Sequence, residues 1–155
     1  MAFLSSINII GSGLTAQQLR LDVVSENITN STTTRTENDG GAYRRKMVVF
    51  EAQSGREDFR SAMAKAVGKA VANRDNGANA GGVRVTQIVD DQSPLKLVYD
   101  PTHPDANEEG YVEMPNVDTV KEITDAMAAT QAYSANVTAF NTLKSVIAKG
   151  LEIGG

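Results

Sequence analysis

Few residues of this 155-residue sequence are placed to do chemistry. His103 is the only histidine and there is no Cys, which excludes disulfides, thiolate zinc sites and cysteine nucleophiles. A catalytic triad or a histidine metal site would therefore have to be built around one residue. Because His103 lies between Pro101 and Pro104, with Asp100 and Asp105 nearby, we interpret it as a turn residue rather than a catalytic base.

Acidic residues offer two further chemistries. The segment 105–110, DANEEG, matches the opening of a calcium loop, but the twelfth position is Asn116, where such loops carry a bidentate Glu. The adjacent acids at 90–91 and 108–109 fit the paired carboxylates of a glycosidase only loosely, since neighbouring acids are common in loops. No phosphate-binding glycine loop or nucleophile elbow occurs. We therefore expect no catalytic residue, no cofactor and no bound metal.

Composition limits the remaining possibilities. Aromatic residues make up 5% of the chain and there is no Trp, so we expect no large self-sufficient core. The net charge of −4 argues against a general nucleic-acid binder. The first basic residue is Arg20, so a cleavable secretory signal is not expected. No stretch approaches the roughly 18 apolar residues of a membrane-spanning helix.

The N-terminal segment has the clearest periodicity in the sequence. Apolar residues spaced alternately by four and three positions, interrupted at Gln17, predict a helix with a coiled-coil seam: Phe3, Ile7, Ile10, Leu14, Leu21, Val24 and Ile28. A second apolar group lies on the opposite side: Ile9, Ala16, Leu19 and Val23. Such a helix requires two partners, and we expect too little of the chain to be available to bury both faces. The helix should end near Asn30, before a run of Ser and Thr.

The C-terminal segment predicts a second long helix. Neither Gly nor Pro occurs from 116 to 149, which allows a helix of about 50 Å. Asn116 or Asp118 is a candidate N-cap, and Thr119 with Glu122 fits a capping box. Two apolar clusters lie on different sides of this helix: Val117, Val120, Ile123 and Met127 form the first, and Tyr133, Val137, Phe140, Leu143 and Ile147 form the second.

The middle of the chain predicts short strands. Residues 43–52, 83–89, 95–99 and 111–114 have strand-like patterns bounded by Gly and Pro, which indicates a small antiparallel sheet. An Ala-rich segment, 57–73, predicts a marginal helix within a variable excursion near 55–82. The predicted fold class is α+β, divided into an N-terminal helix (1–34), a middle β-rich domain (35–115) and a C-terminal helix (116–155).

Two terminal helices with apolar residues on more than one side predict a protein that assembles. Contiguous exposed apolar patches usually mark interfaces. A structural or interaction role is therefore favoured over catalysis on the residues alone.

Four segments carry a family resemblance: GLTAQ (13–17), VSENITN (24–30), YDPTHPDA (99–106) and QAYSANV (131–137). With these segments the chain resembles the flagellar rod and hook family of axial proteins, and within it the proximal-rod members. The resemblance implies a structural subunit of the periplasmic rod, exported uncleaved by the flagellar type III apparatus, with terminal helices packed into a torque-transmitting tube around the export channel.

The resemblance also implies partners and an interface. The partners are other copies and other rod proteins, the membrane-ring (MS ring) protein, the ring-to-rod adaptor and the export apparatus, with no nucleic acid. The expected interface residues lie on the two helices: Ile7, Ile10, Leu14, Leu21, Val24, Asn27, Ile28, Asn30, Tyr133, Val137, Phe140, Asn141 and Ile147. Two other classes stay open, a secreted calcium-dependent binding module and a rod-associated peptidoglycan hydrolase. Metal titration and a muropeptide-release assay would test them.

Overall fold

The computed structural model describes residues 2–37, 40–53 and 81–153. A long helix lies at each end, α1 (Ala2–Thr29) and α3 (Thr119–Ile153). Between them are four described strands: β1 (Lys46–Ala52), β2 (Val83–Asp90), β3 (Lys96–Tyr99) and β4 (Tyr111–Met114). The predicted α+β class is confirmed. The predicted Ala-rich helix at 57–73 lies outside the described residues.

Helix α1 ends at Thr29, one residue before the predicted end. The backbone N–H of Asn30 donates to the carbonyl of Glu26 at 3.0 Å, and the side-chain amide of Asn30 donates to the same oxygen, also at 3.0 Å. A side-chain donor at this carbonyl competes with the continuing helical ladder, which is why Asn favours helix ends. The Ser- and Thr-rich run after it forms turns instead.

The strands pair antiparallel, as predicted, and the described strands form two separate two-stranded sheets. In the first, β1 pairs with β2 from Lys46↔Asp90 to Ala52↔Val83, with a register shift between Val49 and Phe50. In the second, β3 pairs with β4 from Lys96↔Met114 to Tyr99↔Tyr111. The segment between β2 and β3 carries Pro94, which has no N–H to continue a ladder.

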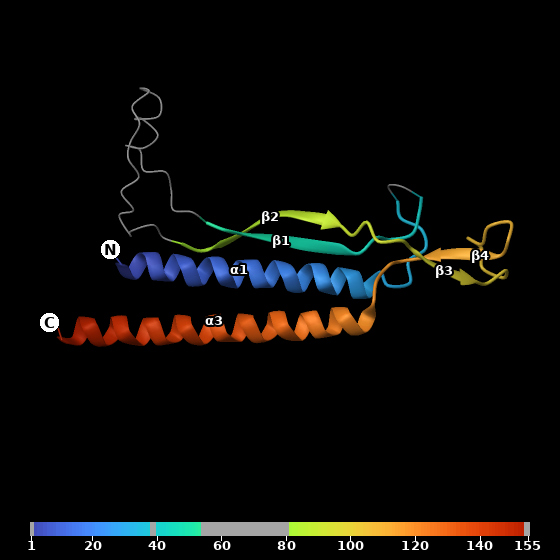
Figure 1. Cartoon of the computed structure of the whole chain (residues 1–155). Coiled ribbons are helices and arrows are strands. Elements are labelled where there is room, and N and C mark those ends of the chain that lie inside the picture. Colours follow the sequence, from blue (N-terminus) through green and yellow to red (C-terminus); the bar gives the residue numbers. More distant parts are fainter. Residues whose placement is uncertain (1, 38–39, 54–80, 154–155) are drawn as a thin grey trace, which may run out of the picture.

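Helix α1 is the middle layer of an elongated molecule. It lies between the β1–β2 ribbon and the antiparallel helix α3, while β3 and β4 extend beyond the helices at one end (Figure 1). Both chain ends lie at the opposite end (Figure 1). Among the residues that the structure describes, these apolar side chains are buried: Ala16, Val23, Val24, Tyr43, Val112, Val117 and Ala129.

The two-sided pattern of α1 has its partners within the chain. Ala16 and Val23, from the second apolar group, are 3% and 4% exposed. The expectation that this face would lack a partner within the chain is therefore wrong at these two positions. The reason is that the β1–β2 ribbon runs along α1 and supplies a second packing surface (Figure 1). Ile9, nearer the N-terminus, remains 41% exposed.

Small residues allow α1 and α3 to approach closely. A Cβ added at Gly13 would lie 3.0 Å from the side-chain nitrogen of Asn136, so a larger residue there would require that side chain or the helices to shift. Ala129 on α3 is fully buried. Gly13 therefore offsets its cost in helix propensity by the packing that it permits.

The N-terminus of α3 corrects one prediction. Asp118 is the N-cap, because its Oδ1 accepts hydrogen bonds from the backbone N–H groups of Val120 (3.1 Å) and Lys121 (3.4 Å). Glu122 does not complete a capping box with Thr119: its side chain turns inward to the rest of the fold, as described below.

Neither described helix combines the length and the apolar character needed to cross a membrane.

Candidate functional site

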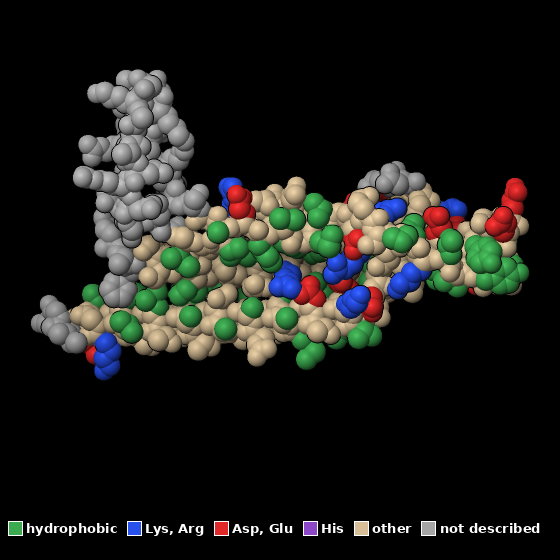
Figure 2. Space-filling model, in the orientation of Figure 1, with side chains coloured by type: hydrophobic (Ala, Val, Ile, Leu, Met, Phe, Trp, Pro, Cys, Tyr) green, Lys and Arg blue, Asp and Glu red, His purple; other side chains and the backbone are tan. Residues whose placement is uncertain are grey.

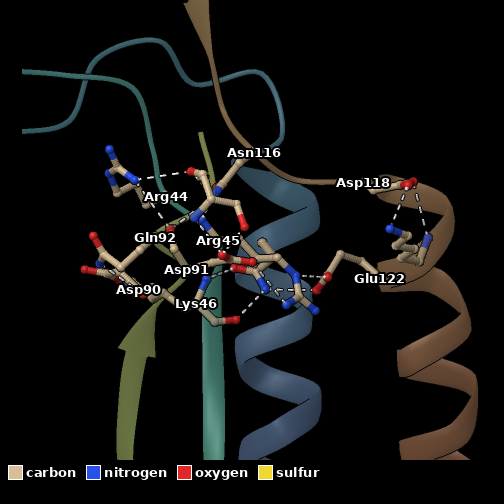
Figure 3. Close-up of polar contacts among 12 residues, drawn as sticks. Arg44, Arg45, Lys46, Asp90, Asp91, Gln92, Asn116, Asp118 and Glu122 are labelled. Atoms are coloured by element: carbon tan, nitrogen blue, oxygen red, sulfur yellow. Dashed lines mark hydrogen bonds and ion pairs between the residues drawn. The ribbon is translucent and has the colours of Figure 1, made fainter. Parts of the chain in front are cut away.

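A largely buried cluster of polar side chains joins α1, the segment that leads into β1, and α3, and we call Asn27, Tyr43, Arg45 and Glu122 the polar junction. Glu122, on the first turn of α3, is fully buried. Its Oε1 accepts a hydrogen bond from Nε of Arg45 at 2.6 Å, and its Oε2 accepts one from the amide of Asn27 at 2.9 Å. Figure 3 shows Glu122 reaching from α3 toward Arg45. Pairing with Arg45 is what makes a buried carboxylate tolerable.

Asn27 is the centre of the polar junction and is also fully buried. Its Nδ2 donates to Glu122 and to the carbonyl of Lys46, each at 2.9 Å. Its Oδ1 accepts from the backbone N–H of Lys46 and from the hydroxyl of Tyr43, each at 2.9 Å. A side-chain amide has two donor hydrogens and two acceptor lone pairs, so every hydrogen bond that Asn27 can make is used.

The chain entering α3 is tied to the same place. The backbone N–H of Arg45 donates to Oδ1 of Asn116 at 2.8 Å, and Nδ2 of Asn116 donates to the carbonyls of Asp91 (3.1 Å) and Ser93 (3.2 Å). Hydrogen bonds from Ser93, and then the nearby positive charge of Arg45, lower the pKa of Asp91. These contacts join the end of the β1–β2 ribbon to the start of α3, and Figure 3 shows Asn116 beside Arg45 and Asp91.

Tyr43 makes the polar junction sensitive to alkaline pH. Burial raises the pKa of its hydroxyl well above the ordinary value of 10.0, and the charges of Glu26, Asp90 and Glu122 raise it further. The folded chain keeps this proton where the unfolded chain releases it, so the free energy of unfolding should fall as the pH rises above that value. Tyr43→Phe removes the proton and the hydrogen bond to Asn27.

We expect Tyr43→Phe to cost about 1 kcal/mol at neutral pH and to flatten the alkaline loss of stability. Denaturant titrations at about pH 7 and between about pH 9 and pH 11 measure both effects. The same alkaline slope in the variant and the unchanged chain would show that Tyr43 is not its source.

The predicted interface residues fall into three groups by exposure. Val24 and Asn27 are buried within the chain. Eight others are partly exposed: Ile7, Ile10, Leu14, Leu21, Ile28, Asn30, Tyr133 and Ile147. Val137, Phe140 and Asn141, on α3, are exposed. Because Gly13 lies against Asn136, the structure brings the α1 positions around Leu14 beside the α3 positions around Val137.

His103, Asp105 and Asn107, which were considered for chemistry, lie in the loop between β3 and β4 and stabilise it. Asp105 accepts hydrogen bonds from Thr34 (2.8 Å) and from Arg35, and its backbone N–H donates to Nδ1 of His103 at 3.1 Å. Oδ1 of Asn107 accepts from the backbone of Glu109 and Tyr111. In the described part of the chain, no three His, Asp or Glu side chains are grouped to hold a metal.

Comparisons with known proteins identify the family. The family model described as "Flagella basal body rod protein" matches residues 7–35, and that described as "Flagellar basal body rod FlgEFG protein C-terminal" matches residues 108–153. The "Flagellar basal-body rod protein FlgC" of Bacillus subtilis is 47% identical over 99% of both chains. The proteins of that name from Borreliella burgdorferi and Escherichia coli O6:H1 are 44% and 41% identical, each over 99% of this chain and at least 98% of their own.

The chain belongs to the FlgC family. It is a structural protein of the flagellar basal-body rod and not an enzyme, and it assembles with other rod components. The two regions matched by the family models contain Asn27 and Glu122, so they meet at the polar junction. In this FlgC-family chain the junction fixes α3 against α1 and β1 and so sets which helix residues face outward.

Sequence reasoning missed most of the polar junction. The sequence predicts that Asn27 faces another subunit and that Glu122 belongs to a helix cap. The local sequence does not distinguish a buried Glu on the first turn of a helix from an exposed one. Capping and the helix dipole favour Glu in the first turn whichever way its side chain points. Correlated substitutions at positions Asn27, Arg45 and Glu122 among related sequences would be the signal that reveals this cluster.

Proposed function

We propose that this chain is a subunit of the proximal rod and that its paired terminal helices pack with other copies and neighbouring rod proteins into a tubular shaft. The observation that carries the proposal is the exposure of large apolar side chains on α3 beside its contact with α1. Val137 and Phe140 are 36% and 38% exposed, and Leu151 is 74% exposed. Apolar side chains in such positions favour burial against another subunit.

The tube would surround the export channel and pass motor torque outward. We propose that the subunit travels through the flagellar type III apparatus to the periplasm and contacts the membrane-ring protein and the ring-to-rod adaptor. A chain without Cys suits such a route, since no disulfide can form before assembly. Subunits related by a rotation that does not close would give a filament-like tube.

Deletion and complementation test the proposed function. A strain that lacks the gene should be non-motile and should build basal bodies that stop at the membrane ring. Expression of this chain should restore swimming and place the chain in purified basal bodies, where electron cryomicroscopy would locate it. Normal rods in the deletion strain, or absence of the chain from purified basal bodies, would contradict the proposal.

The N-terminal part of α1 should order fully only in the rod. Gly11 weakens this part by about 1 kcal/mol relative to Ala and gains no packing in return, because a Cβ there would meet nothing within 4 Å. The polar junction anchors the other end of the helix at Asn27. Hydrogen exchange on the free monomer should therefore be fast in residues 5–13 and slow in residues 20–28. The first segment should become protected in purified rods. Strong protection across residues 3–28 in the monomer would contradict this.

A further inference from the structure

One face of the β3–β4 hairpin exposes a small apolar surface, and we call Leu97, Tyr99, Tyr111 and Glu113 the hairpin patch. Leu97 pairs with Glu113 and Tyr99 with Tyr111 across the two strands, so the four side chains share one face. Leu97 and Tyr99 are each 65% exposed, and Tyr111 is 40% exposed. Figure 2 shows apolar side chains gathered at this end of the molecule.

The hairpin patch is held in a fixed shape. The rings of Tyr99 and Tyr111 pack edge to face with their centroids 5.3 Å apart. Gly110 has a φ of +80°, and a Cβ there would lie 2.9 Å from the ring of Tyr99. On the other face Val112 is 1% exposed, so β4 is anchored from behind, while its partner Val98 on β3 is 42% exposed. Ordered apolar side chains in water lose little entropy on docking, which favours a binding role.

A second exposed apolar surface lies on the first turns of α3, and we call Val120, Ile123 and Met127 the helix patch. These residues are spaced by three and four positions, so they share one side of the helix. They are 72%, 51% and 69% exposed. The polar junction fixes this orientation, because Glu122 must point inward for its neighbours to point outward.

The charges beside the two patches are opposite. Glu113 lies within the hairpin patch, and no ion pair to its carboxylate forms among the described residues. Lys121 follows the first residue of the helix patch, is 81% exposed at its side chain, and its one described ion pair is a 4.0 Å contact with Asp118. An exposed contact of that length contributes little, so Lys121 can pair with a new partner.

We propose that the hairpin patch of one copy of this chain docks on the helix patch of a neighbouring copy, with Glu113 of one opposite Lys121 of the other. The contact joins two different surfaces, so each copy can use its hairpin patch on one neighbour and its helix patch on another. Repeating such a contact builds a ring or an open filament rather than a closed dimer. Since β3–β4 adjoins the start of α3 (Figure 1), the two copies lie alongside each other. The inference rests on the proposed function and adds the surfaces through which copies meet.

The absence of Cys allows a direct cross-linking test. One copy carries Tyr99→Cys and the other carries Ile123→Cys, and both are expressed together in place of the wild-type gene. In purified basal bodies, oxidation should yield a cross-linked dimer of the two variants, at least about fivefold above either variant alone. Gln87→Cys, at an exposed position on β2 away from both patches, is the matched control.

Each outcome decides the inference. Three outcomes would overturn the inference and leave the proposed function intact. The first is assembled rods without the mixed dimer, the second is dimers formed by one variant alone, and the third is cross-links only to another rod protein. Absence of the chain from basal bodies overturns both. Adding Glu113→Lys to the first copy should lower the yield about fivefold, and adding Lys121→Glu to the second copy should restore it. An equal yield in every combination would overturn the proposed register.

Discussion

Replacing Glu122 with alanine should lower the free energy of unfolding of the purified chain by about 3 to 5 kcal/mol. Glu122 is fully buried, and its two oxygens accept hydrogen bonds from Arg45 and Asn27. Truncation leaves the Arg45 guanidinium without its closest partner and one donor of Asn27 unsatisfied. It also leaves space between α3 and the other two elements. Because Asp91 is 3.8 Å from Arg45 it can replace only part of the lost attraction.

Denaturant unfolding followed by circular dichroism measures the effect. Lys121→Ala is the matched control, because Lys121 is the next residue on the helix and its charged side chain is 81% exposed. This substitution should change the free energy of unfolding by less than about 0.5 kcal/mol. If the alanine variant does not fold, Glu122→Gln keeps the shape and one acceptor oxygen, and a loss of about 1 to 3 kcal/mol is then expected. A loss within error for both Glu122 variants would show that the polar junction does not hold the helices together.

Replacing Val137 with aspartate should abolish swimming while leaving the isolated chain folded. Val137 is 36% exposed in the monomer, so a carboxylate there can stay in water until a second subunit covers it. Burying an unpaired charge at an interface costs several kcal/mol, which is enough to prevent incorporation into the rod. Swimming in soft agar and the amount of the chain in purified basal bodies give the two measurements.

Val137→Ile is the control for this prediction, because it keeps the site apolar and should keep motility. Leu21→Asp should also abolish motility, but Leu21 is partly buried within the chain, so its loss of function would mix folding with assembly. Circular dichroism of the purified Val137→Asp variant should match that of the unchanged chain. Normal motility of this variant would remove Val137 from the proposed interface.

The helices and strands follow closely from local sequence. The seam from Ile7 to Ile28 and the run free of Gly and Pro before Lys149 predict α1 and α3, because helix formation depends on spacing and propensity within a few turns. The strand prediction 111–114 matches β4 at both ends, since Gly110 and Pro115 bound it. The prediction for β1 begins three residues early, because Tyr43 turns inward to Asn27 before the ladder starts.

The surfaces of the two helices were also predicted only in part from the sequence. The sequence predicted that α3 has apolar clusters on two sides, and both clusters have members exposed in the structure: Val120, Ile123 and Met127 in the first and Val137 and Phe140 in the second. It did not predict that the β1–β2 ribbon would cover one face of α1, because a ribbon's position depends on contacts between segments far apart in the chain. For the same reason, the described strands form two sheets where the sequence predicted one.

The sequence by itself determined that this is an α+β chain with long helices at both ends, poor in aromatic residues and built to assemble, because composition and periodicity are local properties. Only the tertiary structure decided which polar residues are buried. Asn27 and Glu122 lie 95 positions apart and become partners only when α1 and α3 are aligned to within one turn. That alignment places Glu122 inward and Val120, Ile123 and Met127 outward, because neighbouring positions on one helix cannot all face the same way.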